Sequence, residues 1–231
     1  FLPAEVNLSE HHVGYTVCID GIEYARGMSA PPAMSHQNNI YIRKESFRRL
    51  LWEKLETWRW NKPDNALGRA FACYDCENNL DTALTQMTDA EIENVIQHER
   101  GEIQAGKLLG PKWEELLFNL PHSKLSLYLR ALRDLLADHL STLPALLKHQ
   151  NAPSIHFYFG NLTNLRKELS PQLLQAYQQW VDTGSFKSLE SVIKQGQKHW
   201  AKICDDVLNI YQQTDKDSLN KIQKLIEDNH L

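Results

Sequence analysis

Carboxylate and imidazole side chains on helical segments are the residues whose types and spacing offer chemistry in this sequence. The clearest group is His98–Glu102, which reads His-Glu-Arg-Gly-Glu within a stretch of helical periodicity. Counted at about 100° per residue, Glu99 falls inside the arc of its aliphatic neighbours and Glu102 lies on the flank of that arc. Because an unpaired carboxylate in a core costs several kcal/mol, we expect Glu99 to be neutral, paired with a cation or bound to a metal.

Three other helical segments carry side chains that would complete a metal site. Glu77 continues a ridge of small residues, His139 lies in a leucine stripe, and His156 lies in the apolar run 155–159. Carboxylates and imidazoles from neighbouring helices suit iron or manganese, with open positions for dioxygen or substrate. The sequence therefore predicts a non-haem metal site, with His98 as an acid/base group and these ligands: Glu77, Glu99, Glu102, His139 and His156.

These ligand types, on an all-helical pattern over about 63–169, resemble those of helical di-iron carboxylate proteins of the ferritin-like or haem-oxygenase-like kind. The Glu-x-x-His pairs typical of the ferritin-like group are missing from these helices, and the one match, Glu227 to His230, lies at the end of the sequence. This departure counts more against a two-metal site than against a one-metal site, and we carry over no activity from those families.

Other catalytic motifs are absent or incomplete. Gly-x-Gly-x-x-Gly, the Walker A loop and Gly-x-Ser-x-Gly do not occur. His98 and Glu99 begin the zinc-protease pattern His-Glu-x-x-His, but Glu102 replaces its second histidine. The pair Cys73 and Cys76 is a lone Cys-x-x-Cys without a second pair, and we expect one thiol packed and one exposed.

The same residues also permit functions without metal chemistry, so the sequence leaves open whether the protein is an enzyme. A buried glutamate can pair with Arg69 or Lys54, and a lone core histidine is more often hydrogen-bonded than ligating. The second hypothesis is therefore an interaction or scaffold protein that docks a partner or a second copy through the 186–211 helix and exposed Trp60 and Trp180. A third is a small-molecule pocket, its substrate unknown, lined by Phe157, Phe159, Tyr128 and Trp113.

Helical segments must position these side chains. Periodicity with start and stop signals predicts about eight helices: residues 43–60, 63–79, 88–110, 111–118, 123–143 and 153–169, one opening at Ser170-Pro171, and 186–211. Thr88 and Glu91 look like a capping box, and Pro144 predicts a kink. Residues 15–19 and 22–25 flank Asp20-Gly21 like a β-hairpin, 26–39 look like a loop, and the tail from Asp215 looks frayed. We expect an all-α, single-domain bundle at 43–231, with the hairpin and loop at 1–42 packed on it.

Composition sets the outer limits. The 231 residues, 42% of them hydrophobic, indicate a globular chain with a real core. The formal charge of −4, with 25 Lys+Arg against 29 Asp+Glu, does not favour nucleic-acid binding, and no apolar window is long enough for a membrane span. Four cysteines suggest a reducing compartment, so we expect a soluble, cytoplasmic protein.

Overall fold

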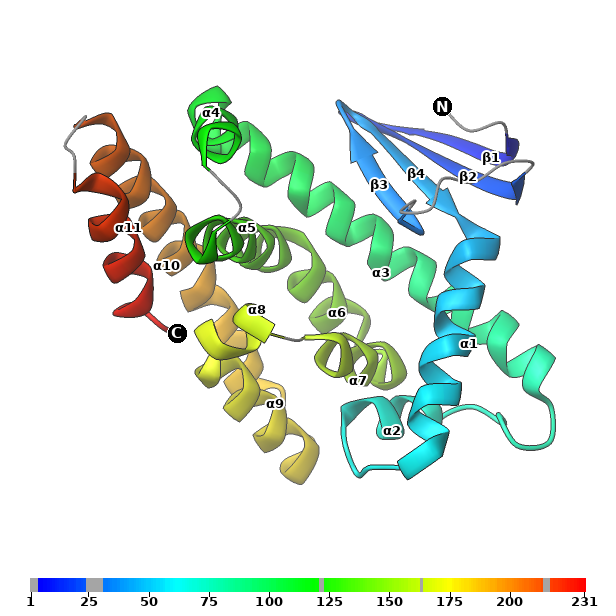
Figure 1. Cartoon of the computed structure of the whole chain (residues 1–231). Coiled ribbons are helices and arrows are strands. Elements are labelled where there is room, and N and C mark those ends of the chain that lie inside the picture. The colour runs from blue at the N-terminus through cyan, green and yellow to red at the C-terminus, as the bar shows by residue number, and fades with distance from the viewer. Residues whose placement is uncertain (1–3, 24–30, 121–122, 163, 214–216) are drawn as a thin grey trace. The chain divides into compact units, whose positions relative to one another are not determined.

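The computed structural model describes residues 4–23, 31–120, 123–162, 164–213 and 217–231 (Figure 1). The chain divides into two compact units, each made from two stretches of sequence. Unit 1 comprises Phe1–Ile103 and Lys148–Asn161, and unit 2 comprises Gln104–Leu147 and Leu162–Leu231. The predicted division at residue 43 is not one of these boundaries.

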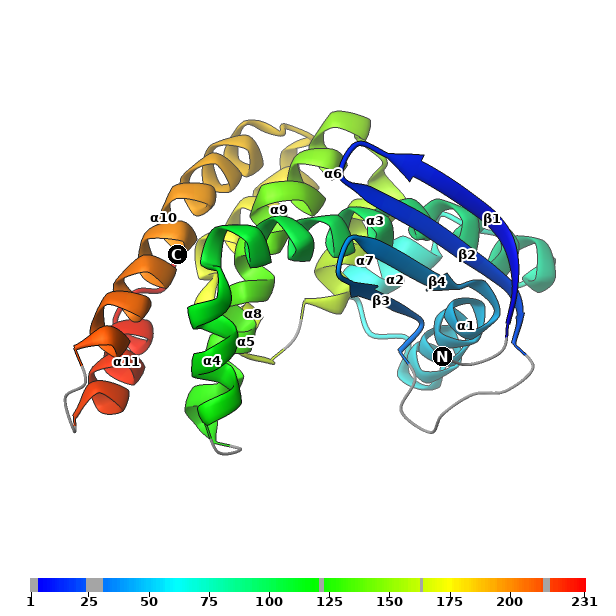
Figure 2. The same cartoon turned by 90° about the horizontal axis from the view of Figure 1, so that it is seen from above.

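Unit 1 contains a four-stranded sheet in the order β1-β2-β4-β3 (Figure 2). Its strands are β1 (Ala4–His12), β2 (Tyr15–Glu23), β3 (Ala33–His36) and β4 (Asn39–Arg43). β2 and β4 pair in parallel, and the two outer strands pair antiparallel to their neighbours. Side chains at Val17, Ile40 and Ile42 are buried and share one core with the helices of unit 1.

The predicted hairpin is displaced in the structure. Asp20 and Gly21 lie inside β2, and the chain instead reverses at Val13-Gly14, where Gly14 has a φ of 91°. Glycine adopts that backbone angle without the steric cost that other residues carry, so Gly14 permits the turn that the sequence analysis had assigned to Asp20-Gly21. A loop was predicted at 26–39, but β3 and the start of β4 occupy most of the part that the structure describes. Residues 26–30 lie outside the described residues.

The helices of unit 1 pack against the sheet and against one another. They are α1 (Lys44–Asn61), α2 (Ala66–Phe71), α7 (Ala152–Asn161) and the first part of α3 (Leu80–Leu109). α1 buries Phe47, Leu51 and Leu55, which lie three to four residues apart and so on one side of the helix. α2 packs closely on α7, where Gly160 leaves room for the Leu67 side chain.

All the regular secondary structure among the described residues of unit 2 is helical. Besides the end of α3, it contains α4 (Pro111–Asn119), α5 (Lys124–Ala137), α6 (Leu143–His149, ending in unit 1), α8 (Asn164–Leu169), α9 (Pro171–Thr183), α10 (Lys187–Gln212) and α11 (Ser218–Glu227). The predicted long helix is confirmed as α10, whose apolar face packs against α5, α9 and α11. A π-helical turn, Asp138–Thr142, separates α5 from α6 just before Pro144, which lacks the N–H that a regular helix needs there.

Three other helix predictions are corrected. α3 begins at Leu80 and not at Thr88, whose hydroxyl donates to the Leu84 carbonyl inside the helix, so the capping box does not exist. α2 ends at Phe71, eight residues early, and the predicted 153–169 helix divides into α7 and α8. The tail is ordered from residue 217, because Ile222 and Ile226 on α11 are fully buried. Among the described residues, no helix has both the length and the apolar character to cross a membrane.

Candidate functional site

Glu99 points inward, as the sequence predicts. Its side chain is only 7% exposed and accepts hydrogen bonds from the backbone and the side chain of Ser35 on β3. Burial, followed by the neighbouring charge of Glu102, raises the pKa of Glu99, whereas His98 and the Ser35 hydrogen bonds lower it. The sheet therefore supplies a partner for this carboxyl group that the sequence did not reveal.

His98 and Glu102 lie one helical turn apart on the more open side of α3. The Nε2 atom of His98 is 3.6 Å from Oε1 of Glu102, and their side chains are 29% and 23% exposed. Together with Glu99 they form a group of neighbouring ionisable side chains, which we name the Glu99 cluster. A carboxyl group with a raised pKa beside an imidazole is an arrangement that can exchange protons.

His139 lies in unit 2 and is completely buried. Its Nδ1 atom is 2.7 Å from the Leu135 carbonyl, which can only accept, so the proton is on Nδ1. Nε2 has no hydrogen-bond partner among the described residues and faces Gly196 of α10. Burial lowers the pKa of His139, which favours the neutral ring.

The other two predicted ligands belong to unit 1 but have different surroundings from Glu99. His156 is half-buried, and burial and then the positive charge of Arg69 lower its pKa. Glu77 is 81% exposed and lies 3.6 Å from Lys62. The reason is that α2 ends at Phe71, so the ridge of small residues predicted to carry Glu77 inward does not continue to it.

No group of three or more His, Cys, Asp or Glu side chains with the geometry to hold a metal ion occurs among the described residues. The structure thus brings together His98, Glu99 and Glu102 of the predicted set and does not add Glu77 to them. The iron or manganese oxidoreductase stays a prediction from the sequence. Near-stoichiometric metal in the purified protein, lost on Glu99→Ala, would be the result that supports it.

Glu91 is a buried carboxyl group that the sequence reasoning missed. It is 3% exposed and accepts hydrogen bonds from the Ser154 hydroxyl (2.7 Å) and the Asn94 amide (3.1 Å). Burial raises its pKa, which the two hydrogen bonds lower in part. The signal was present, because Glu91 follows Met87 by four residues and precedes Ile92, but assigning it to a helix cap placed it at the surface.

The cysteines and aromatic residues singled out in the sequence have structural surroundings. Cys73 is exposed and Cys76 is buried, as predicted, although they lie in turns after α2 and not within a helix. Burial raises the pKa of both thiols, so thiolate chemistry is not favoured there. The four aromatics of the predicted pocket are all buried and are split between the units: Phe157 and Phe159 in unit 1, and Tyr128 and Trp113 in unit 2.

Two surface hollows lie along α1, one on either side of its buried face. The first, which we name the Trp52 groove, has a volume of about 570 Å³ and lies between α1 and the start of α3; it is lined by Glu45, Arg48, Arg49, Trp52, Leu80, Asp81 and Leu84. The second, which we name the Lys54 pocket, has a volume of about 540 Å³ and lies between α1 and the start of α2. Both are within the size range of ligand sites and belong entirely to unit 1.

The fold defines a mostly helical protein with a small N-terminal sheet and places its candidate binding surfaces on unit 1. The chain belongs to the family of unknown function DUF6866, whose C-terminal-domain model matches residues 48–229. That match begins within α1 and extends past the end of α11. No curated protein and no solved structure matches the chain.

Proposed function

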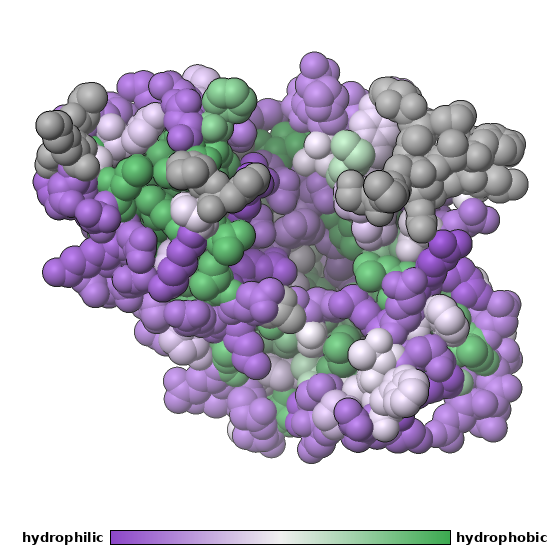
Figure 3. Space-filling model, in the orientation of Figure 1, coloured by the Kyte–Doolittle hydropathy of each residue, from purple (hydrophilic) through white to green (hydrophobic). Residues whose placement is uncertain are grey.

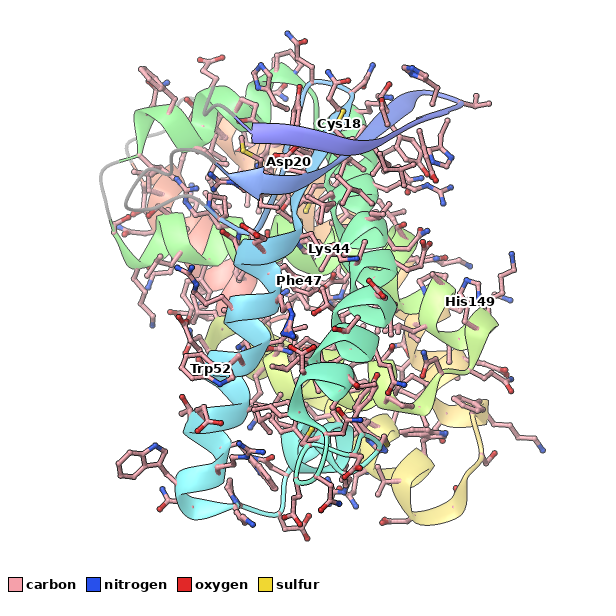
Figure 4. All side chains as sticks on the ribbon, turned by 90° about the vertical axis from the view of Figure 1, so that its right-hand side faces the viewer. Cys18, Asp20, Lys44, Phe47, Trp52 and His149 are labelled. Carbon is pink, nitrogen blue, oxygen red and sulfur yellow. The ribbon has the colours of Figure 1, made fainter. Side chains whose placement is uncertain are left out.

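We propose that this protein is a binding module without catalytic activity, which recognises an acidic, apolar-anchored segment of another protein. The observation that carries the proposal is the Trp52 groove, which the half-exposed indole of Trp52 lines together with Arg48 and Arg49. Figure 4 shows the Trp52 side chain on α1. Tryptophan and arginine are the residues most enriched at the centres of protein interfaces.

Apolar side chains give the groove its floor. Leu84 is 5% exposed and Leu80 is half-buried, both on α3, while the Trp52 side chain on α1 remains 45% exposed. A large apolar side chain that enters this groove would cover Trp52 and remove both surfaces from water. At about 25 cal/mol per Å² of apolar area, that burial is the main attractive contribution we assign to the partner.

The charged residues of the Trp52 groove indicate which charged groups the partner carries beside its apolar side chain. α1 carries five Lys and Arg residues against three Glu, a net charge of +2, whereas the charged residues that line the groove balance, with Arg48 and Arg49 against Glu45 and Asp81. Within the groove, Arg48 is fixed by an ion pair of 2.6 Å with Asp81. Arg49 is exposed and makes no ion pair with a described residue, so it can pair with a carboxylate of the partner.

The surface predicted from the sequence for docking is not the one proposed. Trp60 is 87% exposed, as predicted, but Trp180 is only 8% exposed and packs between Tyr177 and Phe186. The apolar residues of α10 are buried or partly buried within unit 2. A homodimer through residues 186–211 therefore stays a prediction, and we place the docking surface on α1.

Unit 2 also exposes apolar side chains, which Figure 3 shows as a green area over α4, α10 and α11. The most exposed of them is Phe118, at 90%. We find no feature of this patch among the described residues that indicates the charge or the shape of an occupant, whereas the Trp52 groove combines apolar lining residues with Arg49, an exposed cation that pairs with no described carboxylate. We therefore build the proposed function on the groove alone.

A display library of random peptides tests the proposal, with selection on the wild-type protein and counter-selection on the Trp52→Ala/Arg49→Glu variant. We expect the enriched peptides to combine an aromatic or branched apolar residue with a net negative charge. Their Kd for Trp52→Ala should rise about 30-fold, the loss typical of an interface centre. Trp60→Ala is the matched control, because Trp60 is an exposed tryptophan of the same helix that does not line the groove, and it should bind as wild type.

Two outcomes would refute the proposed function. One is that no peptide is enriched over the counter-selection. The other is that the enriched peptides are basic, or that they lose as much affinity with Trp60→Ala as with Trp52→Ala, because binding would then not depend on the groove.

A further inference from the structure

The Lys54 pocket offers a second kind of recognition, which is independent of the proposed peptide site. Its lining residues on α1 include Lys54, Trp58 and Asn61, which lie on the other side of the buried residue Leu51 from the Trp52 groove. The remaining wall comes from Pro63 and Asn65, which lead into α2, and from Leu67 in its first turn. All of these residues belong to unit 1.

Lys54 is the unusual residue of this pocket. Its side chain is half-buried, and it makes no hydrogen bond or ion pair with any described residue. Burial lowers the pKa of Lys54, and no carboxylate of the part of the chain that the structure describes counteracts that effect. Glu53 also lines the pocket, but it is exposed and does not pair with Lys54. The ammonium group is therefore partly removed from water without the anion that would compensate it.

One wall of the pocket is rigid and aromatic. The indole Nε1 of Trp58 donates a hydrogen bond of 3.0 Å to the Pro63 carbonyl, and the indole packs against Phe71 with ring centroids 5.6 Å apart. Gly68 allows this position, since a Cβ there would come within 2.9 Å of Nε1. The apolar surface of Trp58 is therefore held in place before a ligand arrives, which lowers the entropy that binding costs.

Amide groups complete the polar side of the pocket. The Oδ1 atom of Asn65 accepts a hydrogen bond of 2.9 Å from the backbone N–H of Gly68, which assigns the oxygen and leaves the NH₂ group as a donor. Asn61 is exposed at the end of α1 and also lines the pocket. Lys54 and Asn65 thus provide donors beside the apolar side chains of Trp58 and Leu67.

From these features we infer that the Lys54 pocket binds a small carboxylate that carries an aryl or branched-alkyl group. The carboxylate pairs with the Lys54 ammonium and accepts a hydrogen bond from Asn65, while the apolar group lies against Trp58. A single cation matches the single charge of a carboxylate, whereas a phosphate dianion would need a second cation or an arginine fork. The volume of about 540 Å³ is ample for such a molecule.

Titration of ¹⁵N-labelled protein with phenylacetate and with isovalerate tests the inference. The reporter is the indole N–H signal of Trp58. This signal is assigned as the one that disappears from the spectrum of Trp58→Phe. We expect a saturable shift of that signal with at least one of the two acids, and a Kd for the uncharged phenylacetamide at least tenfold weaker than that for phenylacetate. Lys54→Met should weaken the carboxylate at least tenfold, the loss expected for a charge-assisted hydrogen bond, and Lys54→Arg should retain most of the affinity.

Methionine has nearly the same shape as lysine, and Lys54→Met removes a half-buried charge, so the variant should fold. Lys112→Met, an exposed lysine of α4 in the other unit, is the control and should leave the Kd unchanged. The inference is overturned if neither acid gives a saturable Trp58 shift, if phenylacetamide binds as tightly as phenylacetate, or if Lys54→Met binds as wild type. Trp52→Ala should not affect this titration, so a failure of the carboxylate inference can be distinguished from a failure of the proposed peptide site.

Discussion

Replacing Gly196 with alanine provides a sharp test of the packing in unit 2. A Cβ atom at this position would overlap the Cδ2 and Nε2 atoms of the His139 ring and lie 3.1 Å from its Cγ. The ring cannot turn away freely, because Nδ1 is hydrogen-bonded to the Leu135 carbonyl and the side chain is fully buried. The side chain of Gln197 also donates a hydrogen bond of 2.8 Å to the His139 carbonyl, which ties α10 to the π-helical turn.

Two opposing contributions determine the size of the effect. Alanine in a helix interior is intrinsically about 1 kcal/mol more favourable than glycine. Overpacking of a tight core contact costs about 1–3 kcal/mol, and the overlap with a fixed ring places this site at the upper end. The net loss for Gly196→Ala is therefore about 2 kcal/mol, which corresponds to a drop in Tm of about 4–8 °C for a chain of this length.

Urea unfolding followed by circular dichroism measures this loss, with Gly106→Ala as the matched control. Gly106 also lies inside a helix of unit 2, but a Cβ there would meet nothing within 4 Å. This variant should keep only the intrinsic gain and become more stable by about 0.5–1 kcal/mol. In a His139→Ala background the overlap is gone, so Gly196→Ala should no longer cost stability.

If Gly196→Ala is as stable as Gly106→Ala, the His139 ring does not restrict the space at position 196. If Gly196→Ala costs the same free energy of unfolding with and without the His139 ring, the cost has another source than the predicted overlap.

Other predictions concern buried ionisable groups and one helix cap. Burial lowers the pKa of His139, so below about pH 6.5 the unfolded chain binds more protons than the folded one. The free energy of unfolding should therefore decrease as the pH is lowered, by up to about 1.4 kcal/mol per pH unit. Urea midpoints measured between pH 7 and pH 5 should show this slope, and His139→Gln should reduce it. Burial raises the pKa of Glu91, so its stabilising proton uptake is complete below about pH 4.3 and is lost as pH rises through the folded pKa; Glu91→Gln should therefore gain more stability over wild type at pH 7 than at pH 4. Ser123 and Ser126 form a reciprocal capping box on α5, so Ser123→Ala should cost about 1 kcal/mol and lower Tm by about 2–4 °C in a thermal melt.

The elements predictable from the sequence were those with long, uninterrupted patterns. α10 keeps its apolar period for 26 residues, so its course and its buried face followed from the sequence. The β4 strand was missed because Ile40 and Ile42 alternate over only five residues directly before a helix. The hairpin turn was predicted at Asp20-Gly21, which was wrong because a residue that favours turns also fits inside a strand, as Gly21 does in β2.

Site residues followed the same rule. The inward orientation of Glu99 was predictable because it lies in the middle of a long helix, where the phase of the period is well determined. Glu77 was misplaced because its position depended on extending α2 past its true end at Phe71. The partner of Glu99, Ser35, was beyond sequence reasoning, because it is supplied by a strand more than sixty residues away. The hollows beside α1 were equally hidden, since concave surfaces depend on how separate elements pack.

The interrupted make-up of the two units limits how this protein can be dissected. The backbone passes from one unit to the other three times, at residues 103/104, 147/148 and 161/162. A fragment that stops at Ile103 would lack α7. The face of α2 that packs on α7 would then be exposed, and the close contact of Leu67 with Gly160 would be lost. Isolating either unit for biophysical work therefore calls for a rearranged gene in which its two stretches are joined by a new linker, and simple truncations should yield insoluble or protease-sensitive products.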